Sequence, residues 1–184
     1  LRRQRARVGA LLQVRAVAAV LRGDLHPVGG GADHPRQAEQ LQRVVQTDDF
    51  FFFLACIAMI VNRPLAEVRQ VAIDRFKLPK NGPYLFMDDG LIAKLLAHWS
   101  FTATVWKEST GIASLPDLAI GLVEYNHETE IGRHVLFVRQ RNEAGKVQEV
   151  ILDPAPWSPQ EVRTDIKGFP VSWHIGVHAM SKGK

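Results

Sequence analysis

The spacing of apolar residues predicts three helices in the part of the chain that follows residue 50. Residues 51–61 are apolar on every side, which is typical of a buried helix. Residues 65–76 and 90–99 repeat apolar positions every three or four residues, as a helix with one face on a core does. Pro64 suits the first turn of the second helix, and Asp88 suits the cap of the third.

From residue 101 onward the apolar residues recur at every second position, which predicts β-strands. Between two of these strands lies the tetrapeptide Asn-Glu-Ala-Gly, residues 142–145, which predicts a hairpin turn. Helices followed by an antiparallel sheet indicate an α+β fold in one domain. The predicted strands are 101–106, 118–125, 134–141, 146–153 and 171–178.

The predicted hairpin brings a histidine and an aspartate together. If the turn is centred on residues 143 and 144, His134 lies directly opposite Asp153. A histidine that acts as base and acid, with a carboxylate that orients it, is half of the machinery of a thiol peptidase. The alternative is a cross-strand pair on the surface without a catalytic role.

The chain contains one cysteine, Cys56, in the predicted helix 51–61. A single thiol excludes an internal disulfide and a thiolate metal cluster, so a reducing compartment is expected. A nucleophilic cysteine needs a lowered pKa, whereas a cysteine in the run Leu-Ala-Cys-Ile-Ala-Met is commonly a small buried apolar residue. Shortly before this helix, Gln46 is placed to donate a hydrogen bond to an oxyanion.

Residues 46–59 resemble the start of the bacteriocin-leader-processing cysteine peptidases of double-glycine exporters and their free-standing papain-like relatives. That family has a Gln followed six residues later by Cys-Gly-x-Ala-Cys-x-Ala-Met. Here Gln46 is followed at that distance by Phe-Phe-Leu-Ala-Cys-Ile-Ala-Met. Downstream, LPDLAIGLVEY, HVLFVRQ and VILDPAPW resemble the family's Leu-Pro strand, His strand and Asp-Pro segment, so the resemblance extends to about residue 157.

The resemblance implies a papain-like α+β fold, with a buried helix packed on an antiparallel sheet. It assigns proton transfer to His134, orientation of that histidine to Asp153, and oxyanion binding to Gln46 with a backbone N–H. The nucleophile position is Phe52, and Cys56 matches the family's second cysteine, which lies in the core. The resemblance therefore implies a peptidase-type domain without a nucleophile, no cofactor, and a peptide or protein as substrate or ligand, with an export system as a possible partner.

Three interpretations of the phenylalanines follow from this comparison. In the first, the chain is an inactive member that binds peptides without cutting them. In the second, Phe51, Phe52 and Phe53 stand in place of an original Gly-Cys-Gly through an error in the sequence. In the third, Cys56 itself is the nucleophile.

The first 43 residues differ in composition from the rest of the chain. Residues 1–45 use only ten residue types, all of which have codons that begin with G or C. This predicts a GC-rich gene read out of frame; a basic extension and a signal peptide are the alternatives. We therefore expect an atypical extension at 1–43, a peptidase-type domain at 44–178, and a tail at 179–184.

Charge and hydropathy exclude two classes of partner. Residues 1–45 carry eight Arg and three acidic residues, whereas the remainder carries fifteen basic and sixteen acidic residues. The predicted domain therefore lacks the basic surface of a nucleic-acid binder. No apolar run has the length of a membrane helix. The single cysteine favours the cytosol, and the resemblance implies a bacterial protein. His174 and His178 share a strand face near Asp165, where a metal site is the less common alternative to surface polar residues.

Overall fold

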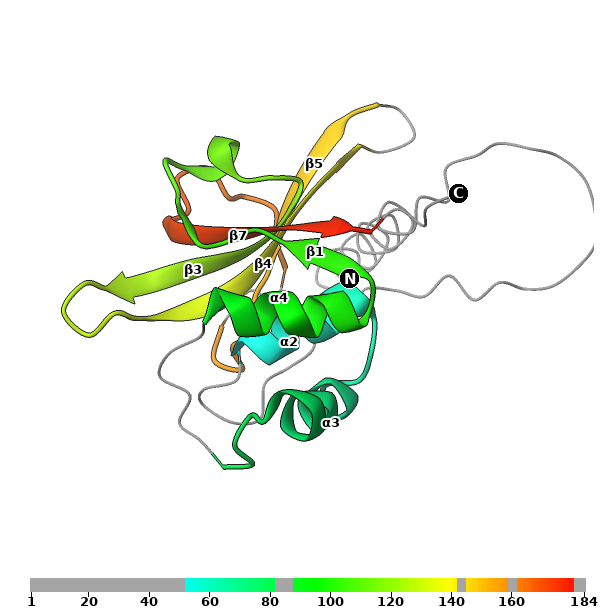
Figure 1. Ribbon diagram of the computed structural model, residues 1–184. Helices are drawn as coiled ribbons and strands as arrows, with labels where there is room; N and C mark the ends of the chain where they lie inside the picture. Colours follow the sequence, from blue (N-terminus) through cyan, green and yellow to red (C-terminus); the bar gives the residue numbers. More distant parts are fainter. Residues whose placement is uncertain (1–51, 82–87, 142–144, 159–161, 181–184) are drawn as a thin grey trace, which may run out of the picture.

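The computed structural model describes residues 52–81, 88–141, 145–158 and 162–180 (Figure 1). Its regular elements are three α-helices, one short 3-10 helix and seven β-strands. The helices are α2 (Phe52–Val61), α3 (Leu65–Phe76), α4 (Asp89–His98) and η1 (Ile112–Ser114). The strands are β1 (Phe101–Ala103), β2 (Lys107–Glu108), β3 (Leu118–Asn126), β4 (Ile131–Arg141), β5 (Val147–Leu152), β6 (Val162–Arg163) and β7 (Val171–Ala179).

The seven strands form an antiparallel sheet, which confirms the predicted α+β class. Its strand order is β1-β7-β3-β4-β5-β6, and β2 pairs separately with β7. Figure 1 shows α2 and α4 lying together against one side of this sheet, with α3 beyond them. Helices come first along the chain and the sheet follows, as the change from a helical to a two-residue period predicts.

Both faces of the sheet are covered by apolar side chains. Leu136 and Val138 of β4 belong to the core that packs against the three helices. Val135 and Phe137 alternate with them and belong to a second cluster, which the segment around Leu115 and Ile166 covers. The central strands are therefore apolar on both faces over much of their length, and buried polar residues such as His134 and His174 interrupt this pattern.

The helices begin and end close to the predicted residues. Helix α3 has the predicted bounds, and its Val68 and Ala72 are fully buried, which confirms the predicted face. Asp88 caps α4 by accepting a hydrogen bond from the Gly90 N–H at 3.1 Å. All nine residues from Phe52 to Ile60 are buried, as expected for a helix that is apolar on every side.

The strand predicted at 101–106 is wrong in its second half. Strand β1 ends at Ala103, and the Thr104 hydroxyl accepts the hydrogen bond of the Gly176 N–H at 2.9 Å. The register against β7 then shifts by one residue before β2 begins. The segment is thus a bulge, in which the extra residue interrupts the ladder and leaves Val105 exposed.

The predicted register of the β4–β5 hairpin is wrong by one residue. Arg141 pairs with Val147 and Leu136 pairs with Leu152, so five residues separate the paired strand ends where the prediction had four. Because neighbouring residues point to opposite faces of a sheet, a shift of one residue changes which side chains meet. His134 therefore does not lie opposite Asp153.

Candidate functional site

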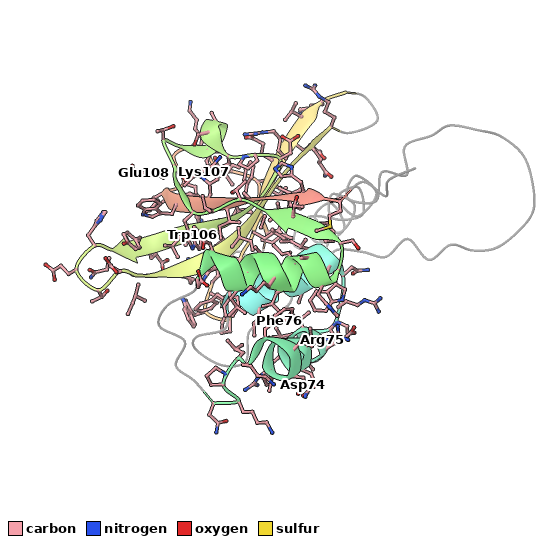
Figure 2. The ribbon with its side chains drawn as sticks, in the orientation of Figure 1. Asp74, Arg75, Phe76, Trp106, Lys107 and Glu108 are labelled. Atoms are coloured by element: carbon pink, nitrogen blue, oxygen red, sulfur yellow. The ribbon has the colours of Figure 1, made fainter. Side chains whose placement is uncertain are left out.

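Four segments distant in sequence meet at the beginning of α2. The ring of Phe53 meets the imidazole of His134 edge-on, with 6.2 Å between the ring centres. Trp106 lies 5.8 Å from the same imidazole, and Figure 2 labels it beside the start of α4. The ring of Phe52 contacts Trp157 edge-on at 5.5 Å. The start of α2 thus makes two aromatic contacts, one from Phe53 to the predicted base His134 and one from Phe52, the predicted nucleophile position, to Trp157.

The alternation of β4 explains why His134 faces the helices. Leu136 and Val138 point into the core between sheet and helices, and His134 stands two residues before Leu136 on the same face. The strand pairs with β3 as far as its first residues, so this position is fixed by the ladder. The imidazole consequently lies beside the first turn of α2.

His134 is an uncharged base in an apolar environment. The residue is 9% exposed, and within the described part of the chain its imidazole contacts the rings of Phe53 and Trp106. Burial lowers the pKa of His134 from 6.5 to about 4, because the charged form loses its hydration. At neutral pH the imidazole can accept a proton from a neighbouring donor.

Acidification should destabilise the protein through His134. The pKa of His134 is about 4 in the folded protein and 6.5 in the unfolded chain. Between pH 6.5 and pH 4 the histidine is therefore protonated in the unfolded chain and neutral in the folded one. Stability then falls as pH drops from 6.5 towards 4, by roughly 3 kcal/mol in total. Urea unfolding at pH 7 and pH 5 should capture roughly 2 kcal/mol of this loss, because pH 5 still lies above the folded pKa. In His134→Gln the loss should shrink, whereas His127→Gln, on an exposed loop, should behave like the parent protein.

Asp153, the predicted orienting carboxylate, binds an arginine in place of His134. Its Oδ1 accepts a hydrogen bond from Arg133 Nη1 at 2.5 Å and another from the Ala155 N–H at 3.0 Å. Arg133 also donates through Nε and Nη2 to both carboxylate oxygens of Glu124, at 3.0 and 2.7 Å. Asp153 is fully buried, and this ion pair supplies it with a positive charge.

The guanidinium of Arg133 stays charged in this arrangement. Burial by itself would lower the pKa of Arg133, but the hydrogen bonds and negative charges of Glu124 and Asp153 outweigh it and raise that pKa. The hydrogen bond from Arg133 likewise lowers the pKa of Glu124. The three residues thus form one coupled unit with a buried end at Asp153 and an exposed end at Glu124.

A nucleophilic cysteine must be accessible and ionised, and Cys56 is neither. Its side chain has no exposed surface, and burial, reinforced by the negative charge of Asp153, raises the pKa of the Cys56 thiol well above its ordinary value. A reactive cysteine requires an accessible thiolate. Cys56 therefore acts as a small core residue of α2, and the structure argues against the interpretation in which it is the nucleophile.

Iodoacetamide should not alkylate Cys56 in the folded protein. The reagent needs a thiolate that it can reach, and the thiol here is both buried and protonated. Because the chain has one cysteine, intact mass should show no adduct under native conditions and one adduct in denaturant. Rapid alkylation of the native protein that is lost in His134→Gln would instead identify Cys56 as an activated thiol.

Some predicted site residues lie outside the described residues or have other roles. Gln46 and Phe51 fall outside the described ranges. His174 Nδ1 is 2.9 Å from the hydroxyl of Ser109, and within the described ranges no group of three His, Cys, Asp or Glu side chains could hold a metal ion. His174 therefore has a hydrogen-bond partner that accounts for its burial.

Sequence reasoning missed Arg133 and Glu124. The available signal was an arginine directly before His134 in a strand that is otherwise apolar, since a buried arginine needs a carboxylate. Glu124 carries a left-handed φ of 53° at a break in the β3–β4 register, and nothing in its sequence neighbourhood indicates that conformation.

The aromatic rings of Phe53 and Trp106 beside His134, and the ion pairs of Arg133 with Glu124 and Asp153, are thus the two features that the fold assembles near the start of β4. None of the described helices is long and apolar enough to cross a membrane. No model of a known protein family matches the chain, and a search of curated proteins finds no match either.

Proposed function

We propose that residues 44–178 form a papain-like, peptidase-type domain that lacks peptidase activity and binds a peptide or protein segment. The observation that carries the proposal is the contact between the first turn of α2 and the imidazole of His134, 6.2 Å from the Phe53 ring. In the cysteine peptidases that the sequence resembles, the nucleophile stands in the first turn of such a helix and the base on such a strand. The antiparallel sheet behind α2 supports the same fold.

The absence of activity follows from the side chains at the helix start. Phe52 has no atom that can attack a carbonyl, and the thiol of Cys56 is buried. His134 is uncharged at neutral pH because its pKa is about 4, so a ring nitrogen can accept a proton, although this pKa makes it a weaker base than an ordinary histidine. The described part of the site therefore retains a base without a nucleophile for it to activate.

Binding is supported by the exposed aromatic surface beside the same position. Trp157 is 58% exposed while its ring contacts Phe52. Exposed tryptophans supply large apolar contact areas in binding surfaces and often carry much of the binding energy. A peptide that crosses the start of α2 would meet Trp157 directly. The proposal that an export system is the partner rests on the sequence resemblance alone.

Phe52→Cys tests the proposal by restoring the missing nucleophile. We expect the new thiol to react with iodoacetamide at neutral pH at least tenfold faster than in Phe52→Cys/His134→Gln, because a neighbouring base contributes about 10²–10⁴-fold to such reactions. The rate is read from the intact mass over time. The parent protein, with Cys56 buried, supplies the unreactive background.

The single substitution is preferable to replacing all three phenylalanines. Phe53 is fully buried and belongs to the main core, so its loss would confuse misfolding with inactivity. Circular dichroism should first show that Phe52→Cys is folded. Equal alkylation rates with and without His134 in folded proteins would refute the peptidase-type site.

A further inference from the structure

The Oδ1 atom of Asp153 accepts two hydrogen bonds, neither of them from His134. Arg133 Nη1 and the Ala155 N–H share its Oδ1, at 2.5 and 3.0 Å. Among the described residues, the imidazole of His134 contacts the aromatic rings of Phe53 and Trp106. Arg133 alternates with His134 along β4, so its side chain starts from the other face of the sheet.

Arg133 itself is held in a fixed orientation by β3. Its Nε and Nη2 both donate to the carboxylate of Glu124. Glu124 lies where the β3–β4 register shifts, between Val123 and Asn126. The left-handed φ of 53° at Glu124 costs energy for a residue other than glycine. Bulges of this kind redirect a side chain, and here the redirected carboxylate meets the guanidinium.

The bond from Ala155 to Asp153 shapes the turn that follows β5. The Ser158 N–H donates to the Ala155 carbonyl at 3.1 Å, which closes the turn that contains Trp157. The indole at this turn then contacts Phe52 edge-on. A continuous series of bonds and contacts thus runs from Glu124 through Arg133 and Asp153 to the ring at the nucleophile position.

We infer that Asp153, paired with Arg133, does not orient His134 and is instead the anchor that holds Trp157 against Phe52. The inference rests on the proposed function, because only in a peptidase-type site would this carboxylate orient the histidine. The chain then differs from such a site in two ways, in the nucleophile and in the orienting carboxylate. Arg133 and Asp153 become positioning residues for the binding surface that Trp157 presents.

Nuclear magnetic resonance on the full chain can test both halves of the inference. In ¹⁵N-labelled protein at pH 7, the ring nitrogens of His134 report its tautomer, and the indole N–H of Trp157 reports the position of the turn. Trp157→Phe assigns that indole among the four tryptophans. The variant is Asp153→Asn, and the matched control is Glu149→Gln, which neutralises one of the two carboxylates that pair with Arg139 and lies on the same hairpin.

In Asp153→Asn we expect the ring nitrogens of His134 to keep the tautomer of the parent protein, while the Trp157 indole signal moves. In Glu149→Gln both signals should stay in place. A change of tautomer at His134 would overturn the inference, since it would show that Asp153 orients the imidazole. An unmoved Trp157 signal would overturn it as well, because the anchor would then be unnecessary.

A second variant covers the case in which Asp153→Asn fails to fold because it leaves the charge of Arg133 buried and unpaired. Arg133→Gln/Asp153→Asn removes both charges together and should give the same two results, because the amides cannot reproduce the ion pair. The proposed function fails by a different measurement, namely equal alkylation rates of Phe52→Cys with and without His134. The two ideas can therefore be refuted separately.

Discussion

Replacing Arg133 with Met should lower the free energy of unfolding by about 3–5 kcal/mol. The substitution keeps an unbranched side chain but removes the positive charge beside Asp153, which has no exposed surface. A buried carboxylate that loses its counter-ion must either remain charged in an apolar site or take up a proton, and both cost free energy. Equilibrium urea unfolding at pH 7 measures the change.

The double substitution Arg133→Met/Asp153→Leu isolates the contribution of the charges. Replacing a buried ion pair by apolar residues of similar volume is often neutral, so the double variant should regain most of the lost stability. Glu124→Gln, at the exposed end of the unit, should cost below about 1 kcal/mol. A cost below about 1 kcal/mol for Arg133→Met would show that water reaches Asp153 and that the pair is not a buried one.

Truncating Phe53 to Ala should cost about 3–5 kcal/mol as well, through a cavity in the main core. The Phe53 ring is fully buried, and it forms one wall of the site around His134. Its loss removes both apolar contacts and the barrier between the imidazole and water. Urea unfolding measures the first effect, and an NMR titration of the His134 ring measures the second.

The two measurements on Phe53→Ala are linked by their physical cause. Because burial is what lowers the pKa of His134, water entering the cavity should raise it from about 4 towards 6.5. Phe53→Leu keeps most of the volume and should cost below about 1.5 kcal/mol, with a smaller change in the histidine. If Phe53→Ala destabilises the protein without changing the titration of His134, the ring does not shield the imidazole.

The helices were predictable because their signals are local. The three-to-four-residue spacing of apolar positions in 65–76 depends only on helical geometry, and so does the cap at Asp88. The burial of Cys56 was equally foreseeable, since every neighbour in its helix is apolar. For the same reason the strands of the hairpin were placed to within a few residues.

The partners of the site residues could not be predicted with equal success. His134 was correctly placed beside the start of α2, yet its expected partner, Asp153, binds Arg133. The error arose from one residue in the length of the turn, which shifts every pair of β4 and β5. No pattern within a strand reveals such a shift, because alternation looks the same in either register.

The sequence by itself thus determined the α+β class, the three helices and the apolar α2, since each depends on residue type or on spacing along one segment. The tertiary structure alone decided that aromatic rings enclose His134 and that Arg133 binds both Glu124 and Asp153. It also decided where the bulges at Thr104 and Glu124 interrupt the sheet. These features depend on contacts between segments distant in sequence, and such contacts form only when the strands pair in one register.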